Sequence, residues 1–467
     1  MSLHLTVLLV YAGLLMTLGL WVGRRVQSTS EFFVAGRRLG PGLIFATLLA
    51  ANLGAGTTVN AAGLGYRDGL SAWWWVGSAG IGSIVLALWV GPRLRRLAAA
   101  HDLHTVGDFL EHRYGPQVRA TIATLLWVGS VGLLAAQLIA MGFVLNAVTG
   151  LDRWVGSVIG GIVVTVYFTA GGLLTSVWVN VVQLGVMAVG FSVALPLIIT
   201  SVGGLGPVVE ATRGIDGYWN PWQGGGSGWF YIAMLGPSFI VSPGILQRVY
   251  AARDDHAVRL GVGLNGVAML LFAVVPALLG MIARSVSPDL SDQNLALPTL
   301  MLESLPPIVG ALGLAAIFSA EVSSADAILF MLATSLSRDL YRRFVRPEAS
   351  DAQVLRVARL AAVVGGTLGT VVAMFSDSIV DALRIFYTLL SVSLFVPVIV
   401  GLYVRRVRTP EAIASIGTGV TVAAVVQTTA GAGGVAGLDP AMLGLGAALA
   451  AMLAAMVVTR NAPMEMS

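Results

Sequence analysis

The chain has 467 residues, of which 57% are hydrophobic and 11% charged, with a formal net charge of +4. A soluble domain carries about 25% charged residues, so this composition argues against a soluble enzyme, a disordered chain and a nucleic-acid-binding protein. There is no Cys and no Lys. The sequence therefore excludes disulfides, thiolate metal sites and a catalytic lysine.

Apolar stretches dominate the chain. A membrane-spanning helix needs about 20 mostly apolar residues, and these stretches predict an all-α polytopic membrane protein with the lipid bilayer as its surroundings. The predicted spans number about thirteen, at 3–23, 41–65, 71–91, 120–147, 154–170, 177–202, 228–247, 260–284, 306–334, 358–376, 379–403, 411–431 and 440–459.

The arginines predict how the spans are oriented. No Arg precedes the first span and Arg24 and Arg25 follow it, which is unlike a signal peptide and places the N-terminus outside. With alternating spans, 22 of the 27 arginines fall in inside segments, as the positive-inside rule expects. We therefore expect an outside N-terminus and an inside C-terminus. The Ala, Gly and Arg bias favours a GC-rich prokaryotic genome and a bacterial cytoplasmic (inner) membrane.

Two spans are interrupted by small residues or proline. The span 41–65 contains AANLGAGTT at residues 50–58, and the span 228–247 contains Gly236-Pro237 and Ser242-Pro243-Gly244. Paired breaks at matching positions of two halves indicate the binding site of a transporter. Because the breaks lie five spans apart, they predict two inverted five-helix repeats. The expected division is 1–40 for a peripheral helix and inside loop, 41–202 for the first repeat, 203–227 for an outside loop, 228–403 for the second repeat, and 404–467 for two peripheral helices and a tail.

The span 306–334 carries the densest polar set inside the membrane. Ser323 and Ser324 lie on the same helix face as Ala320, and Glu321 and Asp326 flank them. Two hydroxyls opposite the free carbonyls of a broken helix form a candidate sodium site, since hard cations prefer oxygen ligands. Interhelical packing is the alternative for such serines, but the neighbouring carboxylates favour a site.

Several short motifs resemble the sodium/solute symporter family, which includes sodium-coupled sugar, proline, pantothenate, sialic acid and monocarboxylate carriers. Residues 28–41 read STSEFFVAGRRLGP, residues 50–53 AANL followed by GLGY at 63–66, and residues 171–183 GGLLTSVWVNVVQ. Gln247-Arg248 followed by Ala251-Ala252 resembles the family's Q-R-x-x-A-A, and residues 318–341 read FSAEVSSADAILFMLATSLSRDLY. The resemblance covers about residues 1–435.

The resemblance implies a LeuT-like 5+5 inverted repeat with broken first and sixth core helices. It also implies Na⁺ as coupling ion, no organic cofactor, and a small-molecule solute as partner. Matched to this sequence, the sodium ligands are carbonyls of Ala50, Leu53 and Ala320 and hydroxyls of Ser323 and Ser324. The substrate is expected against the first broken helix and facing side chains, namely Asn52, Gly54, Thr57, Thr58, Trp74, Ser78, Gln137, Phe239 and Ser242.

The chain departs from the family pattern at one acidic position. Asn180 stands where the family's W-T-D motif has Asp, while Asp326 follows the serine pair. We hypothesise that Asp326 and Asn180 preserve a second cation or proton site, although the family also has an Asp at the position of Asp326. No cationic residue is expected deep in the cavity, which disfavours a dianionic solute and leaves neutral solutes, zwitterions and monocarboxylates open.

These observations favour a sodium-coupled symporter that imports a small organic solute, and not an enzyme. A proton-coupled symporter using Asp326 or Glu321 is one alternative. A membrane sensor that binds a solute without moving it is another, disfavoured because only eight residues follow the last span. The sequence identifies neither the solute nor the oligomeric state.

Overall fold

The computed structural model describes residues 3–23, 38–222, 228–376 and 378–459, without the side chains of residues 167 and 170–177. Motif residues 28–37, loop residues 223–227 and the tail 460–467 lie outside the described part. Across the described part the chain is almost entirely helical. Two isolated β-bridges occur and no strand is formed there, which confirms the all-α prediction.

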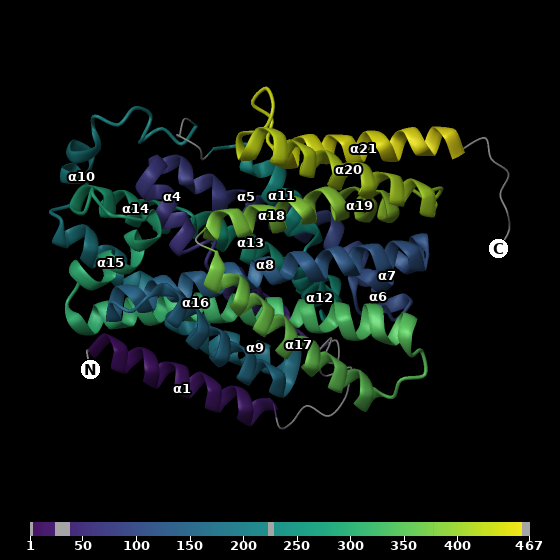
Figure 1. Ribbon diagram of the computed structural model, residues 1–467, viewed down its shortest axis with the longest axis horizontal. Helices are drawn as coiled ribbons and strands as arrows, with labels where there is room; N and C mark the ends of the chain where they lie inside the picture. The colour runs from purple at the N-terminus through teal and green to yellow at the C-terminus, as the bar shows by residue number, and fades with distance from the viewer. Residues whose placement is uncertain (1–2, 24–37, 223–227, 377, 460–467) are drawn as a thin grey trace.

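The helices follow one another along the whole described chain (Figure 1). The α-helices are α1 Leu3–Gly23, α3 Pro41–Asn52, α4 Val59–Asp68, α5 Trp73–Val85, α6 Gly91–Ala100, α7 Val106–Tyr114, α8 Pro116–Thr149, α9 Arg153–Ser201, α10 Leu205–Thr212, α11 Tyr231–Val241, α12 Pro243–Tyr250, α13 Asp255–Phe272, α14 Val274–Val286, α15 Ala296–Glu303, α16 Pro307–Thr334, α17 Asp351–Phe375, α18 Ile379–Leu390, α19 Val396–Tyr403, α20 Thr409–Ala430 and α21 Pro440–Thr459. Short 3₁₀ or π segments are η2 Gly69–Ala72, η3 Leu86–Val90, η4 Gln293–Leu295, η5 Ser335–Val345, η6 Ser391–Phe395 and η7 Gly431–Gly433.

Within the described residues, 11 helical segments are long and apolar enough to cross a membrane. Two expected spans correspond to shorter apolar helices, Pro41–Asn52 and Arg153–Val166. The second of these is the first part of α9, which also contains the expected span 177–202. The protein is therefore a multi-pass membrane protein, while the count of thirteen spans stays a prediction.

A helix break is confirmed in both spans, but α11 continues through Gly236-Pro237, so only the Ser242-Pro243-Gly244 part of the second prediction interrupts the helix. α3 ends at Asn52, and α4 begins only at Val59. α11 ends at Val241, and Pro243 begins α12 after the extended residue Ser242. The second break follows from Pro243, because a proline has no backbone N–H and disfavours the helical conformation of the residue before it.

The two breaks lie in a core flanked by peripheral helices. α1 runs along one edge of the bundle, where it contacts α9 and α16, and α20 and α21 pack against each other along the opposite edge (Figure 1). The long helix α16 contacts α3, α8, α9 and α17. The serine-bearing helix is thereby packed directly against the first broken helix.

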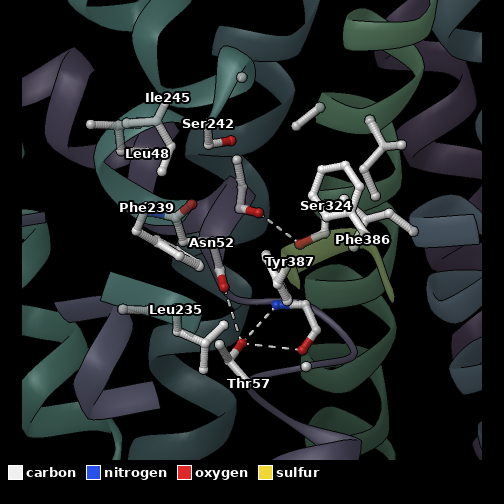
Figure 2. A pocket seen from close by; sticks show the side chains of 18 of the residues that line it. Leu48, Asn52, Thr57, Leu235, Phe239, Ser242, Ile245, Ser324, Phe386 and Tyr387 are labelled. Carbon is white, nitrogen blue, oxygen red and sulfur yellow. Dashed lines mark hydrogen bonds between the residues drawn. The ribbon is translucent and has the colours of Figure 1, made fainter. Parts of the chain in front are cut away.

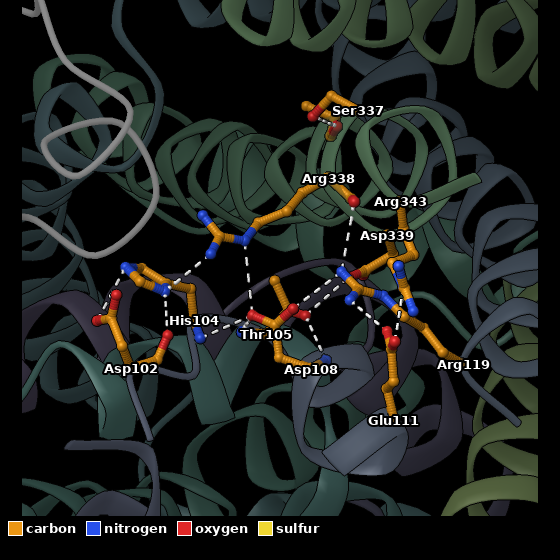
Figure 3. A network of polar contacts seen from close by, with 11 residues as sticks. Asp102, His104, Thr105, Asp108, Glu111, Arg119, Ser337, Arg338, Asp339 and Arg343 are labelled. Carbon is orange, nitrogen blue, oxygen red and sulfur yellow. Dashed lines mark hydrogen bonds and ion pairs between the residues drawn. The ribbon is translucent and has the colours of Figure 1, made fainter. Parts of the chain in front are cut away.

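A buried network of charges joins α7, α8 and η5 on the side predicted to face inside (Figure 3). Arg119 lies at the centre, with Nη2 2.7 Å from Asp339 Oδ1 and 2.8 Å from Asp108 Oδ1, and Nη1 2.8 Å from Glu111 Oε2. Burial raises the pKa of Asp108, but the charges of Arg338 and Arg119 outweigh this and hold that pKa below its ordinary value. The network ties three helical segments into one unit.

Candidate functional site

Side chains satisfy the backbone at the break of the first core helix. The hydroxyl of Thr57 accepts a hydrogen bond from the Gly54 amide at 2.8 Å and lies 3.1 Å from the Asn52 carbonyl. The Ala55 amide donates to Gln137 Oε1 of α8 at 2.8 Å. Irregular backbone at membrane depth is stable only where such partners or a polar cavity are present. The sequence AANLGAGTT thus supplies part of its own hydrogen bonding.

The serine pair of α16 meets the free carbonyls at the end of α3. Ser323 Oγ donates within reach of two carbonyl oxygens, at 2.6 Å from Ala50 and 3.0 Å from Ala320. Ser324 Oγ lies 2.8 Å from the carbonyl of Ala51. Ala50, Ala320 and Ser323 are therefore brought together as predicted, and their three oxygens converge at one point.

Leu53, the remaining predicted sodium ligand, is buried at the start of the break. Its neighbour Gly54 approaches α16 so closely that a Cβ there would lie 2.1 Å from Ser324 Oγ. The second hydroxyl thus lies between Ala51 and Gly54, which each come one residue after a predicted carbonyl ligand, Ala50 and Leu53. Only glycine allows this approach.

A cavity opens beside the two breaks, and six predicted substrate residues line it (Figure 2). Its polar lining comes from α3, the break, α8, α11–α12 and α16, and its apolar lining includes Leu235, Ile245 and Phe386. The predicted residues in the lining are Asn52, Gly54, Thr57, Gln137, Phe239 and Ser242.

Three predicted substrate residues do not line this cavity. Thr58 Oγ1 lies 2.8 Å from Glu321 Oε1 and faces α16. Trp74 Nε1 donates to the Pro221 carbonyl at 2.9 Å, and Ser78 is fully buried beyond the lining. On α5 the cavity face is formed instead by Trp75 and Ala79, each one residue, or about 100° of helix, further on.

Aromatic side chains close one side of the cavity, and sequence reasoning missed most of them. The rings of Trp75 and Tyr231 are 5.0 Å apart, and those of Phe239 and Tyr387 are 5.8 Å apart. Arg384 Nη2 donates to the Tyr231 hydroxyl at 2.8 Å. The run of three tryptophans at 73–75 and the pair Phe386-Tyr387 were the available signals, but neither shows which ring faces inward.

The expectation that no cationic residue lies deep in the cavity is wrong. Arg248 of α12 belongs to the lining and is 1% exposed. Its position in the sequence, at the inside end of a span, suggests a topology determinant at the membrane surface. The break at Ser242 shortens the second half of this span to eight residues, so Arg248 lies less than two turns from the break.

The residues of the predicted second site are both buried. Asn180 Nδ2 lies 3.4 Å from Thr47 Oγ1 of α3. Asp326 lies on α16 three residues after Ser323, and its charge acts on Arg248. Each side chain thus approaches a different neighbour, and a shared site for Asn180 and Asp326 stays a hypothesis.

Glu321 forms a second polar contact between α16 and the break. It is fully buried, and its Oε1 lies 2.8 Å from Thr58 Oγ1, which is also 2.8 Å from the Gly54 carbonyl. One hydroxyl hydrogen cannot serve both acceptors, so a proton on Glu321 would complete this chain of bonds.

Comparison with known proteins identifies the kind of protein that carries this site. A family model described as the sodium:solute symporter family matches residues 32–419. The chain belongs to that family. The resemblance seen in the sequence motifs is therefore confirmed, and membership of this family supports solute transport with sodium as the coupling ion.

Members of the family from distant organisms are similar over most of their length. The sodium/pantothenate symporter of Escherichia coli is 28% identical over 419 residues, covering 85% of this chain and 84% of that protein. The human sodium/iodide cotransporter is 28% identical over 440 residues, 86% of this chain and 66% of that protein. The PutP proline transporter of Bacillus subtilis is 26% identical over 374 residues, 77% and 78% of the two chains.

Solved structures confirm the fold class. A sodium-coupled sialic acid symporter in a substrate-bound outward-open state has a TM-score of 0.82 at 18% identity, covering 97% of this chain and 98% of that chain. The inward-facing Mhp1 transporter has a TM-score of 0.58 at 14% identity, covering 93% and 94%. The chain therefore has the LeuT-like fold.

Proposed function

We propose that the chain is a sodium-coupled secondary active symporter that imports a small organic solute across the cytoplasmic membrane by alternating access. The observation that carries this proposal is the convergence of the Ser323 hydroxyl with the carbonyls of Ala50 and Ala320, beside a cavity at two helix breaks. Membership of the sodium:solute symporter family supports the choice of sodium.

In the proposed mechanism, sodium replaces the hydrogen bond between Ser323 and Ala50. A bound cation is surrounded by oxygen ligands that point at it. Without the ion, Ser323 Oγ and the Ala50 carbonyl oxygen lie 2.6 Å apart and form a direct hydrogen bond. The ion would thereby link α16 to α3 and hold the break in the shape that binds the solute at Asn52, Thr57 and Gln137. The solute and sodium then leave together on the inside.

The membrane potential supplies part of the driving force. One positive charge entering at −100 mV contributes about 2.3 kcal/mol, enough for roughly 50-fold accumulation of a neutral solute before any sodium gradient is added. We propose the orientation with the N-terminus outside and the C-terminus inside from the distribution of arginines.

The test is uptake into proteoliposomes with purified protein. Labelled solutes are supplied under an inward sodium gradient, and under an equal N-methylglucamine gradient. We expect accumulation only with sodium, and Ser323→Ala should raise the sodium concentration needed by at least about 10-fold. As a matched control, Thr334→Ala on the same helix removes a hydroxyl that only bonds back to Phe330, and should transport normally. Binding of a solute without any uptake would instead indicate a sensor.

A second candidate, proton coupling, is favoured by the buried contact of Glu321 with Thr58. Uptake driven by an inward proton gradient without sodium, and abolished by Glu321→Gln but not by Ser323→Ala, would replace the sodium proposal. Uptake that follows only sodium and survives Glu321→Gln would exclude it.

A further inference from the structure

A second cavity, separate from the solute cavity, opens between α18 and the peripheral helix α20. Its volume is about 250 Å³. Apart from four polar side chains, its lining is apolar and consists of Ile385, Leu389, Val392, Val420, Ala423 and Ala424. Ile385 is 61% exposed and Ala424 is also exposed, so the cavity is a groove in the outer surface of the bundle. Because both helices belong to membrane-spanning segments, this α18–α20 groove faces lipid chains.

The groove runs from the membrane surface toward the middle of the bilayer. The connection 404–408 is short, which makes α20 an antiparallel neighbour of the preceding span. The place where α18 begins and α20 ends therefore forms the polar end of the groove, with Arg384, Gln427 and Thr428. Val392 and Val420 lie eight and seven residues deeper than Arg384 and Gln427, or about 10–12 Å at 1.5 Å per residue. The hydrocarbon of one leaflet is about 15 Å thick. The groove thus has the polarity and most of the length of a lipid chain below its headgroup.

Arg384 has the only charged side chain among the described residues that line the groove. It lies in the spanning segment Ile379–Tyr403 and is half-buried. Its Nη2 donates to the Tyr231 hydroxyl at 2.8 Å, and the charge of Asp439 acts on it, but it forms no ion pair with any described residue. A charge within a membrane span is costly unless a group of opposite charge pairs with it. Long arginine side chains near helix ends extend toward the membrane surface, which is where lipid phosphates lie.

We propose that the α18–α20 groove binds one phospholipid molecule, with an acyl chain along the apolar lining and the phosphate at Arg384. A guanidinium binds a phosphate through charge-assisted hydrogen bonds, which are about twice as strong as those between neutral groups. The chain supplies the contacts of the apolar wall, and the phosphate supplies the opposite charge that the described residues do not provide. The site is separate from the solute cavity, and it does not depend on which solute or ion the protein moves.

The experiment measures lipid binding by native mass spectrometry of the full-length protein, delipidated and released from detergent. Three probes separate the two halves of the lipid. Dioleoyl phosphatidylglycerol carries both chain and phosphate, dioleoylglycerol carries the same chains without phosphate, and glycerophosphoglycerol carries the headgroup without chains. We expect the first phosphatidylglycerol to bind at least about 10-fold more tightly than dioleoylglycerol, because only the phosphate pairs with Arg384. Glycerophosphoglycerol should not bind in the same concentration range, because it lacks the apolar contacts.

Substitutions then locate the bound lipid. Arg384→Gln should weaken the first phosphatidylglycerol by about 10-fold. Tyr231→Phe is its control, because it removes the same hydrogen bond between Arg384 and Tyr231 but keeps the charge, and it should bind the lipid normally. Ala424→Phe fills the groove without touching Arg384 and should also weaken binding. Its matched control is Val425→Phe, one residue further along α20, where the side chain is 52% exposed and does not line the groove.

Several results would overturn the proposal. If dioleoylglycerol binds as tightly as phosphatidylglycerol, the groove takes any chain and Arg384 does not select a phosphate. If glycerophosphoglycerol binds as tightly as the whole lipid, the site is one for a free phosphate ester and the groove is not its seat. Unchanged phosphatidylglycerol binding in both Arg384→Gln and Ala424→Phe places the lipid elsewhere. Equal losses in Ala424→Phe and Val425→Phe show that the bulk of a phenylalanine on α20, and not the groove, is responsible.

Discussion

Replacing Gly54 by Ala tests whether the close approach of the break to α16 builds the sodium site. A Cβ at this position would lie 2.1 Å from Ser324 Oγ, 2.5 Å from Ser324 Cβ and 2.7 Å from Gln137 Oε1. Ordinary contacts begin at 3.4 Å, so the neighbours must move by roughly 1 Å. Overpacking of this kind costs about 1–3 kcal/mol. Loss of the bond from Ser324 to Ala51 adds about 0.5–1.5 kcal/mol.

We therefore expect Gly54→Ala to lower stability by about 2–4 kcal/mol and to reduce the stabilisation by sodium. The assay is thermal unfolding of purified protein in sodium and in N-methylglucamine, read by intrinsic fluorescence. Gly42→Ala, on the preceding helix α3, is the control, because no heavy atom lies within 4 Å of a Cβ there. That control should be neutral or slightly stabilising, since alanine favours a helix over glycine by about 1 kcal/mol.

A second variant separates the clash from other effects. Ser324→Gly removes both of the atoms that lie nearest to the added Cβ, so the double variant should regain much of the stability but not the sodium response. If Gly54→Ala is as stable as Gly42→Ala and responds normally to sodium, then the packing of Gly54 against Ser324 does not shape the site, and our reasoning is refuted.

Three further predictions concern the rest of the structure. Arg119→Met should lower stability by about 3–5 kcal/mol in thermal unfolding because it leaves buried carboxylates uncompensated, and adding Asp339→Asn should recover part of the loss; an unchanged melting point would refute this. The pKa of Asp108 is lowered in the folded protein, so the ionised Asp108 carboxylate stabilises the fold at neutral pH, and this stabilisation is lost as pH falls below about 4. Asp108→Asn should therefore make the free energy of unfolding depend less on pH in this range, as measured by unfolding curves at several pH values. Gly280→Ala would place a Cβ 1.9 Å from the Ala62 carbonyl and should unfold the α4–α14 contact, whereas Gly263→Ala meets nothing closer than 3.7 Å and should be tolerated; equal melting points would contradict the packing argument.

The sequence by itself determined the membrane class, both helix breaks and the serine pair. Each of these depends on local chemistry that one stretch of chain carries. An apolar run of about 20 residues spans a bilayer wherever it packs. Pro243 cannot continue a preceding helix, and the two glycines in segment 53–58 destabilise a helix there. Ser323 and Ser324 are adjacent hydroxyls on one helix. The family motifs already indicate that this helix lies beside the first break.

Only the tertiary structure decided which side chains reach the cavity. Trp75 lines it and Trp74 does not, because the rotation of α5 against its neighbours fixes the inward face, and a shift of one residue turns a side chain by about 100°. Thr58 lies against Glu321 and does not line the cavity, because α16 packs behind the break. Arg248 becomes part of the cavity wall because its short helix α12 begins at the break beside the cavity. The charge pattern along the chain places it with the inside arginines, and only packing in three dimensions removes it from water.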